Sequence, residues 1–493
     1  MRNDFTLLPT RLIFYYKRIS WYRIILVLLL GVCFWLTLNN LNYNSPFNDE
    51  AIYVVIGRMG LFQRDWTTYS AQNWMAGSQF FYPPLTAIAY SLGGITASRF
   101  ISIIFGLLAI ISLSWIAKLI SSSQARLTAP IITTAVFGLS SVSLYLSRLA
   151  TYDIAGYSLF FLSYALLLYS PRSTKPARNY FLSATCLVLS YLFNFTTIAY
   201  IPFVVLLSFF EASKHRLFRK YWLIYFLFPL VSSGVIYLLL ELRPTLTYIK
   251  VQATRENIPF RQVIDEFLLN SRLVWPLAAL GVLGMLFKKN WRQLIILLFF
   301  SFLILLIHLF IHRLSTLDKH TYLSVAFASI IAAVGITEFM VKIQNRIFQT
   351  LFIVLLLFAL TVYGVASYQS AQRYNKLWEN ANILMDFLAY QQKPGDKILV
   401  EAGPQLILAS YEVNYPSNIS TFDWFEYKGQ KGFGAYSQAV ADGYFDYIQL
   451  NSDYKLKNPV YTEVHTRVSE NLDENYDLIF RQDYFYVYKN AHK

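Results

Sequence analysis

The chain has 493 residues, of which 56% are hydrophobic and only 14% are charged. A soluble domain carries about a quarter charged residues, so this composition excludes an ordinary soluble protein and predicts a polytopic α-helical membrane protein. The formal net charge is +14. Because the Lys and Arg residues fall in short clusters between apolar runs rather than along one polar face, no nucleic-acid partner is expected. The two cysteines, Cys33 and Cys186, lie inside apolar runs and predict neither a disulfide framework nor a metal site.

The apolar runs predict the membrane spans. The amino terminus leads into the first run without a small-residue cleavage site, which indicates a retained helix rather than a signal peptide. A span needs about 17 to 25 residues, or fewer where Tyr and Trp flank it. About 11 transmembrane helices are therefore expected, centred on residues 24–38, 100–117, 129–147, 154–170, 180–194, 196–211, 221–240, 273–287, 293–311, 321–338 and 348–366.

Short basic connections predict the orientation. The segments "KLISSSQAR", "PRSTKPAR", "KHRLFRK", "KKNWRQ" and "VKIQNR" fall on the same side as the basic amino terminus. The positive-inside rule places that side in the cytoplasm. The expected location is the plasma (inner) membrane. Residues 39–99 and 241–272 then form external loops. The apolar segment 83–95 has only 13 residues and contains two glycines, so we place it in the first external loop as a re-entrant or interfacial helix.

The last quarter of the chain changes character. From about Tyr368 charged residues, Gly, Asn and Asp return. The segments "DKILVEAG", "SNISTF", "FDYIQL" and "DLIFRQDYFYVYK" are typical of strands, and "PQLILASY", "AYSQAVADG" and "VYTEVHTRVSENLDENY" are typical of helices. The expected organisation is thus a membrane domain, residues 1–367, and a small extracytoplasmic α/β domain, residues 368–493.

Two adjacent carboxylates follow the first predicted span. The stretch "SPFNDEAIYVVIGRM", residues 45–59, contains Asp49 and Glu50 in an acid-poor neighbourhood. Acids at a helix amino terminus are favoured by the helix dipole alone, so capping of a following helix is one interpretation. A catalytic role is the other. Asp153 leaves the same choice open, because it precedes the predicted helix 154–170.

Several cations are predicted on the same external face. Arg99, Arg148, Lys319 and His320 either anchor helix ends at the headgroups or bind an anion. Carboxylates facing cations suit sugar transfer from a lipid phosphate, which needs cations near the phosphate and one base for the acceptor hydroxyl. A single base with a displaced phosphate implies inversion at the anomeric carbon. His308 and His312 share a helical face, but without a nearby Glu they are typical of satisfied interior histidines rather than zinc ligands.

The order of these features resembles the polyprenyl-phosphate-sugar-dependent glycosyltransferases of GT-C fold. This class includes protein O-mannosyltransferases and the bacterial aminoarabinose transferase of lipid A. The resemblance covers about residues 1–365 and rests on "NDEAIYVVIGRM", "RDW", "YPPL", "ASRFISIIFGLL", "SRLATYD" and "DKHTYLSVAF". The chain departs from the family at Phe81 and Tyr82, where many members have Glu-Lys before Pro-Pro-Leu. A metal site like the one proposed for the aminoarabinose transferase is therefore in doubt.

The resemblance implies roles for the candidate residues. Asp49 would be the catalytic base, with Glu50 and Asp153 as supporting acids. The donor phosphate would be bound by five further residues: Arg58, Tyr82, Arg99, Lys319 and His320. The partners would be a polyprenyl-phosphate-linked sugar donor, a lipid, glycan or protein acceptor, and membrane lipids. No cofactor is required by this scheme, and a divalent metal stays open.

Two other functional classes fit the sequence. A transporter or flippase of lipid-linked sugars would share the many helices and cationic contacts. Transporters, however, tend to carry ionisable residues near the membrane midplane and repeated halves, whereas here the charges lie at external helix ends without an evident repeat. A non-catalytic member of the same family, whose external domain binds a partner, also fits.

Overall fold

The computed structural model describes residues 8–39, 41–68, 75–252, 258–375, 378–422, 425–451, 459–472 and 475–493. Residues 40, 69–74 and 253–257 of the predicted external loops lie outside these ranges. The chain forms two compact units. The first, which we call the helical unit, comprises Met1–Leu41, Gln72–Ser78 and Arg99–Tyr374. The second, the α/β unit, comprises Asn42–Ala71, Gln79–Ser98 and Asn375–Lys493.

Helix covers most of each of the eleven predicted apolar runs, but the run 129–147 is divided between α4 and α5, and the run 196–211 between η2 and α8. The helical unit contains α1 (Leu8–Leu38), the second part of α3 (Tyr82–Ile120), α4 (Ala129–Gly138), α5 (Ser141–Leu146), α6 (Tyr152–Tyr169), η1 (Ser170–Arg172), α7 (Pro176–Phe193), η2 (Phe195–Ala199), α8 (Ile201–Ala212), α9 (Arg216–Trp222), η3 (Leu223–Leu227), α10 (Phe228–Gln252), α11 (Phe260–Ser271), α12 (Trp275–Phe287), α13 (Trp291–Ile311), α14 (Leu317–Lys342) and α15 (Arg346–Tyr374). Among the described residues, 7 helices are long and apolar enough to cross a membrane, or up to 8 if α11 and α12, bent by 84°, count as one span. Eleven crossings stays a prediction.

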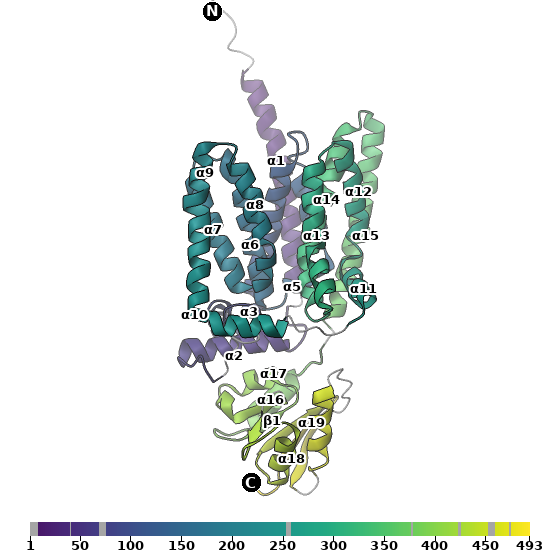
Figure 1. Ribbon diagram of the computed structural model, residues 1–493. Coiled ribbons are helices and arrows are strands. Elements are labelled where there is room, and N and C mark those ends of the chain that lie inside the picture. The colour runs from purple at the N-terminus through teal and green to yellow at the C-terminus, as the bar shows by residue number, and fades with distance from the viewer. Residues whose placement is uncertain are drawn as a thin grey trace, which may run out of the picture. The chain divides into compact units, whose positions relative to one another are not determined.

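Helix α14 is the most buried of the long apolar helices. It packs against α4, α12 and α13 (Figure 1). Its contact with α12 depends on glycine, because a Cβ at Gly335 would lie 1.7 Å from the carbonyl oxygen of Gly281. Small residues allow helix backbones to approach closely where a bilayer offers no hydrophobic drive between helices. The backbones of α12 and α14 therefore touch at this crossing.

Gly335→Ala is expected to destabilise the helical unit by at least about 1–3 kcal/mol, since the new methyl group meets backbone atoms that can move only with the whole helix. Thermal unfolding of the full chain in detergent measures the effect. Gly234→Ala in α10 is the matched control, because its Cβ would meet nothing within 4 Å. Equal stability of the two variants would contradict the close crossing.

The break in α3 lies at its two glycines. Gly93 and Gly94 have non-helical backbone angles, and Gly94 has φ +63°. Glycine adopts positive φ without steric cost. The predicted segment 83–95 is therefore helical up to this pair, and the helix belongs to the α/β unit before Arg99 and to the helical unit from Arg99 onward. Whether the segment is re-entrant or interfacial stays a prediction.

The α/β unit is built around a five-stranded sheet of order β2-β1-β5-β7-β6. Strands β1, β2 and β5 are parallel, whereas β7 is antiparallel to both β5 and β6. Its elements are α2 (Asn48–Phe62), the first part of α3, α16 (Asn382–Gln391), β1 (Ile398–Val400), α17 (Pro404–Ser410), η4 (Pro416–Asn418), β2 (Ile419–Thr421), β3 (Glu426–Tyr427), β4 (Gln430–Lys431), α18 (Phe433–Ala441), β5 (Tyr447–Asn451), α19 (Pro459–Ser469), β6 (Tyr476–Gln482) and β7 (Phe485–Asn490).

Both faces of the sheet are covered by helices. Ile398 and Val400 of β1 contribute to one core, together with apolar side chains of α2, α16 and α17. Leu399 points to the other core, which α18 and α19 complete. This alternation is the ordinary period of two along a strand. The helix that carries the acidic pair, α2, thus packs on the α/β fold through Ala51, Val54 and other buried residues.

The predicted strands and helices of this unit fall close to the observed elements. The segment "DLIFRQDYFYVYK" is two strands, β6 and β7, joined by a tight turn in which Asp483 has φ +48°. Asp is among the residues that tolerate this conformation. Helix α16 and the short hairpin of β3 and β4 had no counterpart among the predicted elements, and residues 473–474 of the predicted helical segment lie outside the described residues.

Candidate functional site

The eight predicted site residues divide between the two units. Asp153, Arg99, Lys319 and His320 belong to the helical unit. Asp49, Glu50, Arg58 and Tyr82 belong to the α/β unit. Each group is described within its own unit.

Asp153 and Lys319 face one another in the helical unit. Asp153 lies in the first turn of α6 and Lys319 in the first turn of α14, and their side chains are 5% and 10% exposed. Lys319 Nζ lies 3.9 Å from Asp153 Oδ2, and Asn194 Nδ2 donates to Asp153 Oδ1 at 2.9 Å. The carboxylate is therefore held by a cation and an amide from two other helices.

Asn194 also shapes the turn that follows α7. Its side-chain oxygen accepts a hydrogen bond from Thr196 N at 2.8 Å, which starts η2. The turn approaches α6 at Gly156, where a Cβ would lie 2.6 Å from Asn194 Cβ. Asn194 thus couples the position of Asp153 to that of Thr196.

A chain of hydrogen bonds extends from Thr196 through two histidines. Thr196 Oγ1 lies 3.0 Å from His320 Nε2, His320 Nδ1 lies 2.9 Å from His308 Nε2, and His308 Nδ1 lies 2.8 Å from the carbonyl oxygen of Arg313. A carbonyl only accepts, so in neutral rings Nδ1 of each histidine carries the proton and Thr196 donates to His320. The prediction that His308 is a satisfied interior histidine is confirmed.

An apolar cavity of about 710 Å³ ends at these polar groups. Its walls come from α7, η2, α8, α10 and α13, and include Tyr191, Phe195, Leu230 and Ile304. Its polar lining includes Thr196, Thr245, His308, Arg313, Thr316 and His320. We call it the histidine cavity. An elongated apolar molecule with an anionic end matches a cavity of this composition, because Arg313 can pair with an anion and Thr196 and Thr316 can hydrogen bond to it.

Arg99 is fully buried. One of its guanidinium nitrogens, Nη1, donates to the carbonyl oxygen of Leu41 at 2.8 Å. It thus ties α3 to the segment that follows α1. Phosphate binding by Arg99 stays a prediction.

The acidic pair differs in burial within α2. Glu50 is fully buried, and its Oε2 accepts a hydrogen bond from Phe47 N at 2.7 Å. This contact satisfies a backbone donor at the start of the helix, which is the role of the third residue in a capping box. Asp49 is only partly buried. Glu50 thus caps the helix, and Asp49 is the less buried of the two. A catalytic role for Asp49 stays a prediction.

Arg58 and Tyr82 make contacts inside the α/β unit. The Arg58 guanidinium forms an ion pair with Glu412 and lies 4.2 Å from the ring centroid of Tyr411. Tyr82 is fully buried with its ring edge against Tyr53, 5.9 Å between centroids. Arg58 therefore ties α2 to the end of α17, and Tyr82 packs beneath α2. Donor-phosphate binding by either residue stays a prediction.

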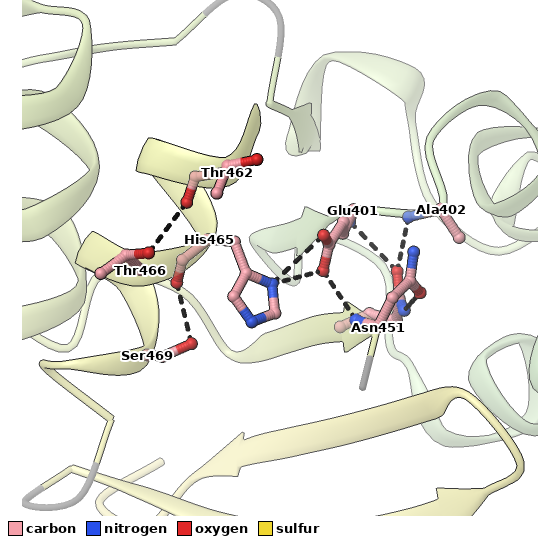
Figure 2. A network of polar contacts seen from close by, with 8 residues as sticks. Glu401, Ala402, Asn451, Thr462, His465, Thr466 and Ser469 are labelled. Atoms are coloured by element: carbon pink, nitrogen blue, oxygen red, sulfur yellow. Dashed lines mark hydrogen bonds and ion pairs between the residues drawn. The ribbon is translucent and has the colours of Figure 1, made fainter. Parts of the chain in front are cut away.

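A second buried carboxylate lies at the carboxyl end of the parallel strands (Figure 2). Glu401 follows β1 directly, and its Oε2 lies 3.0 Å from His465 Nδ1 of α19 and accepts from Asn451 N at the end of β5 at 2.6 Å. Burial raises the pKa of Glu401, and the hydrogen bond and charge of His465 oppose that rise. The network joins β1, β5 and α19.

His465→Ala is expected to destabilise the α/β unit more at pH 7.5 than at pH 4.5. Folding raises the pKa of the Glu401 carboxyl group above its ordinary value of 4.5. The free energy of unfolding therefore falls as the pH rises from 4.5 through the pKa of the folded state. Loss of His465 raises that pKa further, so an ionised Glu401 costs about 1–3 kcal/mol more at the higher pH. Hydrogen exchange of peptides covering β1 and α19 measures it, with the exposed His492→Ala as control. A loss independent of pH would contradict this account.

The sequence predicted no role for Asn194, Thr196 or Arg313, although Arg313 is among the polar residues expected at the external ends of the helices. Asn194 and Thr196 occur in "YLFNFTTIAYIP", where nothing but their polarity within an apolar run marks them. In the part of the chain that the structure describes, no three His, Cys, Asp or Glu side chains gather as a metal site.

Comparisons with known proteins place the fold. No protein-family model matches the chain, and no curated protein matches its sequence. Among solved structures, ArnT from Cupriavidus metallidurans in the apo state matches with TM-score 0.64 and 12% identity over 96% of this chain and 98% of that one. The same protein bound to undecaprenyl phosphate matches with TM-score 0.61 and 13% identity, with the same coverage of both chains. The chain has the GT-C fold.

Other GT-C structures agree with this assignment. The arabinofuranosyltransferase AftD from Mycobacteria matches with TM-score 0.59 and 14% identity over 95% of this chain but 40% of AftD. The Archaeoglobus fulgidus oligosaccharyltransferase AglB, in complex with an inhibitory peptide and a dolichol-phosphate, matches with TM-score 0.57 and 11% identity over 96% of this chain and 74% of AglB. At these identities the similarity concerns the fold, so the activity is argued from the residues of this chain.

Proposed function

We propose that this protein is an integral-membrane glycosyltransferase that moves a sugar from a polyprenyl-phosphate carrier to an acceptor on the extracytoplasmic face. The observation that carries the proposal is the histidine cavity, an apolar cavity with Arg313 and three threonines in its polar lining. Its apolar walls suit a prenyl chain, and Arg313 and the threonines suit a phosphate. The GT-C fold supports the proposal, and one protein of this fold has been solved bound to undecaprenyl phosphate.

The helical unit supplies cations for the leaving group. Arg313 would pair with the donor phosphate, with Lys319 nearby in sequence and ion-paired to the buried Asp153. The neutral hydrogen-bond chain from Thr196 through His320 to His308 would hold that end of the cavity rigid. Fixed charges placed where negative charge develops lower the barrier without reorganisation during the reaction.

The base is assigned to Asp49. Its carboxylate would remove the proton from the acceptor hydroxyl while the hydroxyl oxygen bonds to the anomeric carbon. The bond from that carbon to the phosphate oxygen breaks, and the polyprenyl phosphate departs as an anion. One displacement with one base inverts the anomeric configuration. Glu50, held in its cap contact, would orient the first turn of α2.

The test is transfer of a labelled sugar by the purified chain in vesicles. We expect transfer from a polyprenyl-phosphate donor to extracted envelope lipids, glycans or proteins, and none from the corresponding nucleotide sugar. The measurement is the label recovered in acceptor, together with the anomeric configuration of the product by NMR. Movement of the donor across the vesicle membrane without transfer would instead identify a flippase and overturn the proposal.

A further inference from the structure

A second cavity lies at the opposite end of α13. It has a volume of about 630 Å³ and is lined at that end by Arg292, near the start of the helix. Helix α13 has 21 residues and therefore spans about 30 Å, and the histidine cavity contacts its other end at His308 and Ile311. The polar ends of the two cavities thus lie near opposite ends of α13, whereas their apolar linings, at Leu297 and Ile304, come within about 10 Å of each other along the helix.

Four helices contribute their ends to this cavity. The last turns of α3, α6 and α8 and the first turn of α13 surround it. Its walls are apolar: Ile116, Leu119, Ile120, Leu167, Leu168, Leu207, Phe210, Ile296 and Leu297. Three cations stand around these walls, namely Arg172, Lys214 and Arg292. We call it the basic cavity.

The charges of the basic cavity do not cancel. Its one carboxylate, Glu211, accepts hydrogen bonds from Lys214 Nζ at 2.7 Å on both oxygens. Arg172 uses Nη1 on the carbonyl oxygen of Leu119 at 2.7 Å, which leaves further N–H donors of the same guanidinium. Within the described ranges the Arg292 side chain makes no hydrogen bond or ion pair. Two guanidinium groups therefore line a mainly apolar space that carries excess positive charge and whose other polar residues include Ser208 and Gln293.

We propose that the basic cavity binds an anionic glycerophospholipid, with the headgroup phosphate between Arg172 and Arg292 and an acyl chain against Leu168 and the other apolar walls. A helix-end position places the two guanidinium groups at headgroup depth and the apolar walls at acyl depth. Basic pockets between membrane helices select anionic headgroups because each Lys or Arg adds to the attraction of an anionic lipid. A zwitterionic lipid would gain the acyl contacts but not the net charge.

The experiment measures thermal stabilisation of the delipidated full chain in detergent by added phosphatidylglycerol or phosphatidylcholine. We expect phosphatidylglycerol to raise the unfolding temperature and phosphatidylcholine to have little effect. Arg172→Gln combined with Arg292→Gln should raise the half-maximal phosphatidylglycerol concentration by about thirtyfold. Leu168→Trp, which fills the cavity without changing charge, should weaken binding as well.

A control variant distinguishes binding of phosphatidylglycerol in the basic cavity from its general attraction to a positively charged protein. Arg178→Gln combined with Arg346→Gln removes the same charge from exposed positions that do not line the cavity. It should leave the phosphatidylglycerol response unchanged. An equal loss in both double variants, or stabilisation by undecaprenyl phosphate but not by phosphatidylglycerol, would overturn the proposal. Since the readout is lipid binding, the result does not depend on the transfer reaction.

Discussion

Asp49→Asn is expected to lower sugar transfer by about 10²–10⁴-fold while donor binding and stability stay unchanged. The amide keeps the size of the side chain and is accepted in the first turn of a helix, but it cannot take a proton from an acceptor hydroxyl. Because the loss concerns only the reacting state, kcat and kcat/KM should fall together. The measurement is initial-rate transfer from a polyprenyl-phosphate donor, with donor binding followed separately.

Two variants control for nonspecific effects. Asp265→Asn removes an exposed carboxylate of α11 and should transfer at the wild-type rate. Glu50→Gln alters the buried acceptor of the Phe47 N–H. It should lower the stability of the protein more than the rate of the chemical step. Unchanged transfer by Asp49→Asn would remove Asp49 as the base, and a loss explained by unfolding would do the same.

Lys319→Met is expected to destabilise the helical unit by about 3–5 kcal/mol. The substitution leaves the buried Asp153 carboxylate with its Asn194 contact but without the Lys319 cation. The double variant Asp153→Asn/Lys319→Met removes both charges and should recover most of the lost stability, because the cost is that of an uncompensated buried charge. Thermal unfolding in lipid nanodiscs ranks the stabilities of the wild type, Lys319→Met and the double variant.

The double variant also separates stability from function. If Lys319 helps to neutralise the leaving phosphate, the stable double variant should still transfer about 10²-fold more slowly than the wild type. Lys342→Met, at the exposed end of the same helix, should change neither property. If the double variant is as unstable as Lys319→Met, the uncompensated charge of Asp153 is not the cause of the lost stability.

Much of the fold was predictable because hydrophobic length is a property of the sequence alone. A run that is long enough for a bilayer must form backbone hydrogen bonds internally and so becomes helix. All eleven runs are mostly helical, and the strands at "DKILVEAG", "SNISTF" and "FDYIQL" follow from their local pattern. The resemblance to GT-C enzymes rested on the order of short motifs, and the fold agrees with it.

The partners of the site residues were not predictable, because they lie far away along the chain. Arg58 pairs with Glu412, which is 354 residues away. Asp153 is held by residues of α14 and the end of α7, and no local pattern connects them. Asn194 and Thr196 carry no motif, yet packing of α6, α7 and α14 makes them central to the helical unit.

The sequence by itself determined the membrane class, the helical runs, the small α/β sheet and the short list of acids and cations. Only the tertiary structure decided which of these groups are buried and what they contact. It separated Glu50, a buried cap, from the more accessible Asp49, and it formed the two cavities from the ends of several helices. The physical reason is that burial and electrostatic pairing depend on which surfaces pack together, and elements distant in sequence supply those surfaces.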